Sequence, residues 1–462
     1  MSPTINTWLT RILLLLCITL YIIHFWIILQ NAVNVPYWDE WMILVPDALP
    51  AGFSLRWVLV QEAEHRLVLT KLLSWGLFYL NSHNHILSMA ITYVMYGVLL
   101  TFIVVFARKM VPYLPLWGVL AFLVFLLTPI NWENNFWGFQ STFRLSLLFT
   151  VLASYFLFSE RQTMRHLALG TVMSVLATYS FFSGLIAVSI LIALFACFKV
   201  TRALRAHGSQ RRSEYLQVIG VVTTVLVFIG LYFVDYHAAR HHRRLVLPQE
   251  PGFWKFFTNL VSWGFGFETQ SVVLGALCVL LVLAPIALHA WQKRLHVAAS
   301  SWAIYAVSLS MMVVLASIAS GRAEISPSAK ISRYSDFAMM FVPFTAFGWA
   351  IFLKDRPNLR KYVLVGLWFF CCLGFSYKWR WYRVYAVERA SRQQGVQCIK
   401  SYYQHGGQAF CPTLYWEPIP GQLDEAKRLN LSFYRDIDLA LKEEKKSETG
   451  GEISKGVDER RP

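Results

Sequence analysis

The sequence predicts an all-α protein that crosses a membrane about eleven times. Hydrophobic residues make up 56% of the 462 residues and charged residues only 15%. This composition, with a mean hydropathy of +0.47, is far from that of an average soluble domain. Apolar runs of membrane-spanning length recur along most of the chain, and basic residues collect in every second loop between them.

The membrane segments follow from the apolar runs in chain order. The first run, residues 12–29, follows a lone Arg11 and has no small-residue cleavage site behind it. We therefore expect an uncleaved first span with a cytoplasmic N-terminus. Residues 1–377 are predicted to form a transmembrane domain whose long first outer loop covers residues 30–85. The further predicted spans are residues 86–107, 112–129, 142–158, 166–180, 183–198, 216–234, 271–290, 298–318, 337–353 and 362–377.

The loops between these spans alternate in charge, which predicts their orientation. Arg108 and Lys109 follow the second span, and basic groups follow every second span after it, as cytoplasmic loops do. An odd number of spans then places the C-terminus outside. The other basic residues expected in the cytoplasm are Arg161, Arg165, Lys199, Arg202, Arg205, Arg211, Arg212, Lys293, Arg294, Lys354, Arg356, Arg360 and Lys361.

The segment after the last span gives mixed signals. The stretch "YKWRWYRVY" alternates aromatic and basic residues as interfacial helices do. We expect residues 378–441 to form an interfacial helix and a small outer cap, and residues 442–462 to form a disordered polar tail. Cys398 and Cys411 could form a disulfide if the cap lies outside. The positive-inside rule argues against an outer location because of Lys378, Arg380, Arg383, Arg389 and Arg392.

The net charge of +16 does not indicate a nucleic-acid-binding protein. The basic residues lie in short loops between apolar spans rather than on one face of a soluble domain, so membrane topology explains them. The chain has neither a glycine-rich phosphate loop nor a cytoplasmic globular domain. We therefore expect no nucleotide-sugar site.

The first outer loop begins with two adjacent carboxylates in "PYWDEW", where Asp39 and Glu40 lie between Trp38 and Trp41. Partial burial between tryptophans would raise the pKa of a carboxyl group, and a nearby arginine would lower it. Either effect can adjust a general base to its task. The alternative is an ordinary aromatic belt at the membrane surface with solvated acids beside it.

A second group of ionisable residues, "QEAEHR", lies in the same loop. If residues 55–80 form one amphipathic helix, Glu62 and Arg66 are i,i+4 partners, and the pair satisfies itself. Alternatively, Glu64, His65 and Arg66 meet Asp39 and Glu40 to form a catalytic site. Four of these residues suit Mg²⁺, Mn²⁺ or Zn²⁺, but no compact ligand spacing supports a metal site: Asp39, Glu40, Glu64 and His65.

The second outer loop, "NWENNFWGFQSTFR", combines acid and amide groups with flat aromatic faces. Sugars present hydroxyl groups at the rim and C–H groups on the faces, so this mixture favours carbohydrate binding, although an interfacial aromatic loop is the alternative. An unpaired charge near the start of a span would be costly. The predicted sugar- or acceptor-binding residues are Trp38, Trp41, Glu133, Asn134, Trp137, Gln140 and Arg144.

Two later outer loops are basic, against the charge trend of the other loops. They read "HAARHHRR" and "GRAEISPSAKISRYSDF". Arginine side chains bind phosphate oxygens in a bidentate manner, so these loops favour a lipid-linked phosphate. Attraction to anionic lipid headgroups is the alternative. The predicted donor-phosphate residues are Arg66, Arg243, Arg244, Arg322, Lys330, Arg333 and Tyr334.

The ordered motifs also carry a family resemblance over roughly residues 10–435. "PYWDEW", "EAEHRLVLTKLL", "NWENNFWGFQ", "YSFFSGL" and a late "GR" with "SRY" resemble a large group of poorly characterised bacterial multispanning proteins. That group is similar to the GT-C class of polyprenyl-phosphate-sugar-dependent glycosyltransferases, which implies a GT-C-like fold with interfacial helices in the first outer loop.

The resemblance also implies roles for individual residues. An acid of the first outer loop acts as base or metal-dependent anchor, which matches Asp39 or Glu40. Basic residues of later outer loops hold the donor, which matches Arg322 and Arg333, then Arg243 and Arg244. The group has an asparagine where this chain has Ala63, which leaves the role of Glu64 open.

The sequence thus predicts an inverting glycosyltransferase of the bacterial inner membrane with a periplasmic active face. It would move a sugar from undecaprenyl phosphate to a periplasmic glycan or lipid-linked acceptor. An O-antigen polymerase or ligase would use similar substrates and basic loops. A flippase or transporter without chemistry would instead carry ionisable residues near the bilayer midplane and paired broken spans. The predicted spans contain few charges and show no such pairing.

Overall fold

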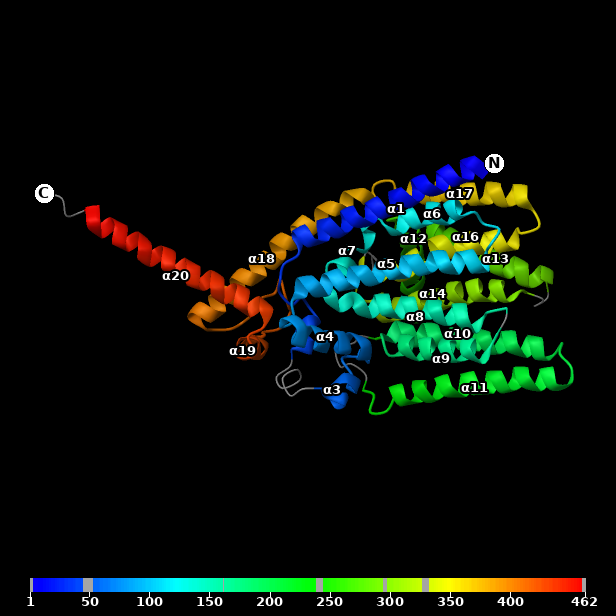
Figure 1. Cartoon of the computed structure of the whole chain (residues 1–462), viewed down its shortest axis with the longest axis horizontal. Coiled ribbons are helices and arrows are strands. Elements are labelled where there is room, and N and C mark those ends of the chain that lie inside the picture. Colours follow the sequence, from blue (N-terminus) through cyan, green and yellow to red (C-terminus); the bar gives the residue numbers. More distant parts are fainter. Residues whose placement is uncertain are drawn as a thin grey trace.

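The protein is almost entirely helical in a computed structural model that describes residues 3–44, 53–160, 162–237, 244–293, 297–325 and 332–458 (Figure 1). Within these ranges there is no strand, only an isolated backbone bridge between Glu62 and His65. The long helices are α1 (Pro3–Asn31), α5 (His85–Met110), α6 (Leu116–Leu126), α8 (Ser141–Leu157), α9 (Met164–Thr178), α10 (Phe182–Ala203), α11 (Gly208–Tyr232), α13 (Val272–Lys293), α14 (Ala299–Arg322), α16 (Phe341–Phe352) and α17 (Pro357–Phe375).

Nine helical segments of the described residues are long and apolar enough to cross a membrane. Seven are single helices, and the other two, Leu116–Asn135 and Ser332–Phe352, each combine short helices. The chain is therefore a multi-pass α-helical membrane protein, as its composition predicts. The predicted spans 142–158 and 166–180 coincide with α8 and α9, which have 17 and 15 residues and are shorter than the roughly 20 residues that usually cross a bilayer.

The composite segments Leu116–Asn135 and Ser332–Phe352 each contain short helices, which lie at one end of the bundle. On the first, η1 (Pro129–Asn131) and α7 (Trp132–Asn135) follow α6, and η2 (Gly138–Gln140) leads into α8. On the second, η3 (Ser332–Tyr334) and α15 (Ser335–Met339) precede α16. The two sets of short helices lie in contact with each other.

The predicted first outer loop, residues 30–85, contains three helices, α2 (Glu40–Ile43), α3 (Leu55–Leu59) and α4 (Val68–Asn81). The single helix expected over residues 55–80 is wrong, because a turn separates α3 from α4 and Ala63 adopts φ +49° there. The expected Glu62 and Arg66 pair is also wrong, since Glu62 pairs with Lys71 at 2.7 Å.

Helix α12 (Pro251–Gly264) lies where the sequence predicts only loop. Proline occupies its first turn, where a missing N–H costs nothing, and phenylalanines at 253, 256 and 257 bury one face. Gly264 permits close packing, because a Cβ there would lie 2.3 Å from the carbonyl oxygen of Ala338. The helix is too short to be recognised as a span.

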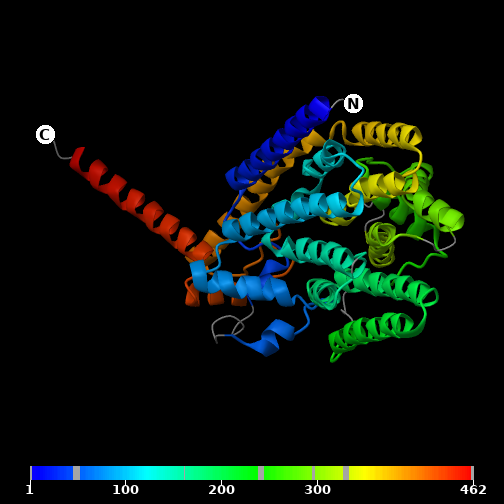
Figure 2. The same ribbon diagram turned by 45° about the vertical axis from the view of Figure 1, so that its right-hand side comes forward.

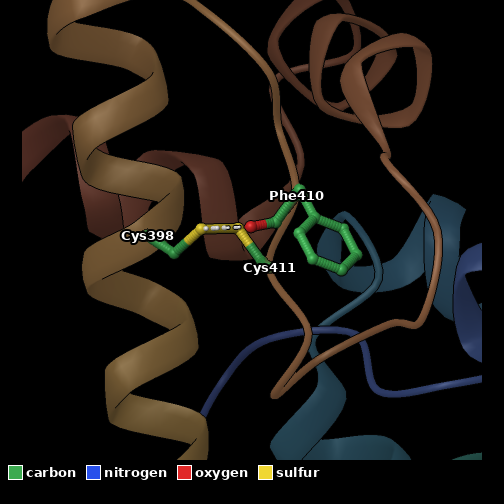
Figure 3. The surroundings of a disulfide bond; sticks show 3 residues. All are labelled: Cys398, Phe410 and Cys411. Carbon is green, nitrogen blue, oxygen red and sulfur yellow. Dashed lines mark hydrogen bonds between the residues drawn. A yellow bond between two sulfur atoms is a disulfide. The ribbon is translucent and has the colours of Figure 1, made fainter.

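The C-terminal region forms a cap with its own small core. After η4 (Lys378–Trp381), helix α18 (Tyr382–His405) runs beside α1, and α19 (Pro420–Arg428) and α20 (Ser432–Asp458) follow (Figure 1). A disulfide joins Cys398 of α18 to Cys411 in the loop before α19 (Figure 3). Helix α20 extends away from the bundle in both views and continues to Asp458, into the range 442–462 predicted to be a disordered tail (Figure 2).

Candidate active site

The two adjacent carboxylates of "PYWDEW" have different surroundings. Glu40 is 2% exposed, and its carboxylate accepts hydrogen bonds from the backbone N–H groups of Tyr37 (2.9 Å) and Phe139 (3.1 Å). Nδ1 of His85 lies 3.4 Å from the same carboxylate. Gly138 is required beside it, because a Cβ there would lie 2.1 Å from Oγ of Ser88. Glu40 therefore ties the first outer loop to the second.

Asp39 is the N-cap residue of α2 and is only partly buried. Its carboxylate has no hydrogen-bond or ion-pair partner within the described part of the chain. Burial raises its pKa, Arg333 and Arg322 lower it, and Glu64 raises it again, so that the pKa lies above the usual value of 3.8. Asp39 therefore has the accessibility and the raised basicity that a general base needs.

Glu64 and Arg322 approach Asp39 from different elements. Glu64 lies in the turn between α3 and α4, and its Oε1 is 3.7 Å from Nη2 of Arg322 at the end of α14. Nε2 of His65 lies 3.4 Å from the same oxygen, and the His65 ring packs at a tilt against Phe181 with 3.9 Å between centroids. The structure thus brings Glu64 within electrostatic range of Asp39.

Hydrogen bonds between residues 130–133 and residues 332–333 fix the position of Arg333. Oγ of Ser332 donates to the carbonyl of Ile130 (2.8 Å) and accepts from the N–H of Glu133 (3.3 Å). The N–H of Arg333 donates to the Glu133 carboxylate (2.7 Å). Asp39 and Glu133 both lie close enough to Arg333 to influence it electrostatically. We call Asp39, Glu64, Glu133, Arg322 and Arg333 the Asp39 cluster.

Arg144 belongs to a separate buried network, and its partner Asp336 is missed by the sequence analysis. Nε of Arg144 lies 3.1 Å from Oδ2 of Asp336, and Nη2 donates to Asn135 (2.6 Å). The amides of Asn131 and Asn134 each donate to Asp336 at 2.7 Å. We call these five residues the Arg144 network. They are buried, so Asn134, one of the two amides predicted to bind a sugar, is already engaged.

Arg392 of α18 adjoins the Asp39 cluster, although no sequence motif indicates it. It is 1% exposed, and its guanidinium lies 4.1 Å from the centroid of Tyr37 and 4.4 Å from that of Phe136. Its Nε and Nη1 have no hydrogen-bond partner among the described residues. Burial lowers the pKa of Arg392, against the influence of Tyr37, Glu40 and Glu388.

The two ring contacts compensate the burial of Arg392 only in part. A cation–π contact contributes about 2 kcal/mol or somewhat more when it is desolvated. Burying a charge without a counter-ion costs several kcal/mol even after relaxation. Arg392 therefore carries charge that the described residues leave only partly compensated.

The cap supports the turn that carries Asp39. The N–H of Trp38 donates to the carbonyl of Leu414 (2.8 Å), and Trp38 adopts φ +48°. Leu414 packs on Gly395 of α18, where a Cβ would lie 2.3 Å from the leucine side chain. Trp41 is fully buried against Phe433 of α20, with 5.7 Å between ring centroids.

The other predicted site residues lie outside the Asp39 cluster or beneath it. Arg66 is buried, and its guanidinium donates to the backbone carbonyls of Tyr232, Leu59 and Val234. Arg244 is exposed and pairs with Glu250 at 2.6 Å. Arg243 and Lys330 lie outside the described residues.

Among the predicted sugar-binding aromatics, only Trp38 is exposed, at 37%. Trp137 is buried, with its ring 5.6 Å from that of Tyr37. Gln140 is also buried, and Tyr334 is buried below the Arg333 guanidinium. Within the described ranges, no group of three His, Cys, Asp or Glu residues could hold a metal ion.

A groove of about 1150 Å³ opens beside the turn that carries Glu64. Its walls are apolar and come from α4, α9 and α11, including Leu69, Val175 and Phe228. Polar residues of the groove include Gln61 of the same turn and His237. Apolar walls that end in polar groups suit an amphipathic ligand with a long hydrocarbon chain.

Comparison with known proteins gives no relative for this chain, because no family model, curated protein or solved structure matches it.

Proposed function

We propose that this protein is a glycosyltransferase that takes a sugar from undecaprenyl phosphate and transfers it, with inversion, to a glycan or lipid-linked acceptor. The observation that carries the proposal is the Asp39 carboxylate, which has no partner in the described residues and lies near Arg322 and Arg333. The nearby apolar groove supports a lipid-linked donor. The resemblance to GT-C enzymes agrees with this chemistry but rests on motifs alone.

In the proposed reaction, Asp39 accepts the proton of an acceptor hydroxyl. The hydroxyl oxygen forms a bond to the anomeric carbon as the bond between that carbon and the donor phosphate oxygen breaks. The phosphate departs with the bonding electron pair, and Arg322 and Arg333 stabilise its negative charge. Attack opposite the leaving group inverts the configuration. A divalent cation such as Mg²⁺ or Mn²⁺ is not part of this proposal.

The disulfide supports an extracytoplasmic location for this end of the bundle, because disulfides persist in oxidising compartments. In a bacterium that location is the periplasmic face of the inner membrane. The prenyl chain would lie in the groove along α4, α9 and α11, and the partly exposed Trp38 is the aromatic face available to a sugar.

The test uses the full chain in liposomes that contain a radiolabelled polyprenyl-phosphate sugar and an acceptor-lipid extract. We expect wild-type protein to move label into the acceptor, and Asp39→Asn to lose this activity. Asp355→Asn, an exposed aspartate between α16 and α17, is the matched control and should transfer normally. Label that crosses the bilayer without changing carrier would support a transporter and contradict the proposal.

A further inference from the structure

Arg392 differs from the other fully buried cations of the described chain. Each of the others has a carboxylate within ion-pair distance, as expected for charge taken out of water. No such carboxylate accompanies Arg392, since Glu40 and Glu388 act on it only from beyond 4.0 Å. The paired cations are Arg144 with Asp336 (3.1 Å), Lys71 with Glu62 (2.7 Å), Lys378 with Glu268 (3.0 Å) and Lys199 with Glu214.

The position of Arg392 points to a ligand rather than to packing. Its nearest ring, Tyr37, is only partly buried and also lies within electrostatic range of Arg333 and Glu133. A ligand bound at the Asp39 cluster would therefore be one side chain away from Arg392. Unpaired N–H groups of a buried guanidinium are donors prepared for an anionic acceptor.

We propose that Arg392 forms a second anion-binding position beside Tyr37, in addition to Arg322 and Arg333, and that the natural ligand places a phosphate or carboxylate there. The identity of the ligand rests on the proposed function, but the anion site itself does not. The second anion could be the second phosphate of a diphosphate-linked donor or an acidic group on the acceptor.

The experiment measures binding by the purified full-length protein in detergent. The probes are farnesyl phosphate, farnesyl diphosphate and glucuronic acid. Wild-type protein is compared with Arg392→Met, Arg392→Lys and the control Arg383→Met, which removes an exposed arginine of the same helix. Thermal unfolding without ligand is recorded for each variant.

If the second anion belongs to the donor, wild type binds the diphosphate about tenfold more tightly than the monophosphate. Arg392→Met removes this preference, Arg392→Lys keeps part of it, and Arg383→Met keeps all of it. If the anion belongs to the acceptor, wild type binds both prenyl phosphates equally and binds glucuronic acid, and Arg392→Met loses only glucuronic acid. Either pattern supports the second anion site.

Thermal unfolding separates a ligand site from a packing role. Without ligand, Arg392→Met should unfold at a higher temperature than wild type, because a buried charge without a counter-ion has been removed. If it unfolds at a lower temperature and binds all three probes as wild type does, the proposal is overturned. If Arg392→Met does not fold, unchanged probe binding by Arg392→Lys overturns it, and reduced anion preference supports it. A failed sugar-transfer assay would leave these outcomes unaffected.

Discussion

The Arg144 network and the Asp39 cluster lie in neighbouring parts of the same fold, but they differ in whether their charged side chains have partners. In the network, Arg144 has a counter-ion in Asp336, and the amides of three asparagines hydrogen-bond to one or other of these two residues. In and beside the cluster, Asp39 and Arg392 lack hydrogen-bond and ion-pair partners among the described residues. A compensated charge stabilises the bundle, whereas an uncompensated one remains available to a ligand.

The largest effect is expected from breaking the Arg144 network. Asp336→Asn leaves Arg144 buried without its counter-ion and should lower the free energy of unfolding by about 3–5 kcal/mol. Denaturant unfolding of the purified protein measures this. The double variant Arg144→Met with Asp336→Leu removes both charges and should recover most of the loss. If Asp336→Asn is as stable as wild type, the network is not compensated as described.

Removing the disulfide of the cap should have a smaller effect, which extends to the Asp39 cluster but not to the Arg144 network. Replacing Cys398 and Cys411 by serine removes a crosslink between residues 13 apart, which should cost about 3 kcal/mol of cap stability. Because Leu414 holds the backbone of Trp38, sugar transfer should fall and protease cleavage of the cap should rise. Cys197→Ser, which removes an exposed free cysteine, is the control. Unchanged cleavage and transfer would show that the cap does not support Asp39.

Asp39 and Glu40 show the same difference between an unpaired and a hydrogen-bonded charge within the motif "PYWDEW". Glu40→Gln weakens two backbone hydrogen bonds to a charged acceptor and should lower stability by about 1–3 kcal/mol. Asp39→Asn breaks no hydrogen bond of the described residues and relieves burial of a charge, so stability should stay the same or rise. Unfolding curves of the two variants side by side test this, and a larger loss for Asp39→Asn would reverse the assignment.

The smallest expected effect concerns pH. With Asp39 as the base of the proposed reaction, the raised pKa predicts that transfer falls as the pH falls through a value above 3.8. Arg322→Met removes a charge that lowers this pKa, so the acid limb should move to higher pH, by about one unit. Glu64→Gln removes a charge that raises it, so the limb should move to lower pH. A rate–pH profile in which both variants match wild type contradicts the electrostatic account.

The raised pKa of Asp39 also predicts how the free energy of unfolding changes with pH. The folded protein holds the Asp39 proton more tightly than the unfolded chain does, so this stabilising contribution is complete below pH 3.8. It is lost as the pH rises through the raised pKa of the folded state. Wild type should therefore lose stability relative to Asp39→Asn across that window, and parallel unfolding midpoints for the two proteins would contradict the raised pKa.

The helices could be predicted from the sequence where long apolar runs occur. Each predicted run overlaps a helix of the structure, because membrane spans depend on local composition rather than on distant contacts. Helix α12 was not predicted because it is short and amphipathic. Its apolar residues are interspersed with polar ones and do not form a continuous apolar run. The turn at Ala63 was missed because no glycine or proline marks the positive φ.

The site was accessible only in part. The three motifs that carry Asp39, Glu64 and Arg322 could be recognised because charged residues lie in loops between apolar spans. The distinction between Asp39 and Glu40 depends on hydrogen bonds from Phe139, about a hundred residues away, and no local pattern reports these. Asp336 appears only as one more polar residue in its loop. Arg392 is one of several arginines in α18, and burial alone distinguishes it.

The most direct test of the central claim compares Asp39→Asn with Glu40→Gln in the liposome transfer assay, with rates normalised to folded protein. The account predicts that Asp39→Asn lowers transfer by about 10²–10⁴-fold, the usual contribution of a general base, while Glu40→Gln keeps most of the rate per folded molecule. Normal transfer by Asp39→Asn, or selective loss in Glu40→Gln, would contradict the claim that Asp39 is the functional acid.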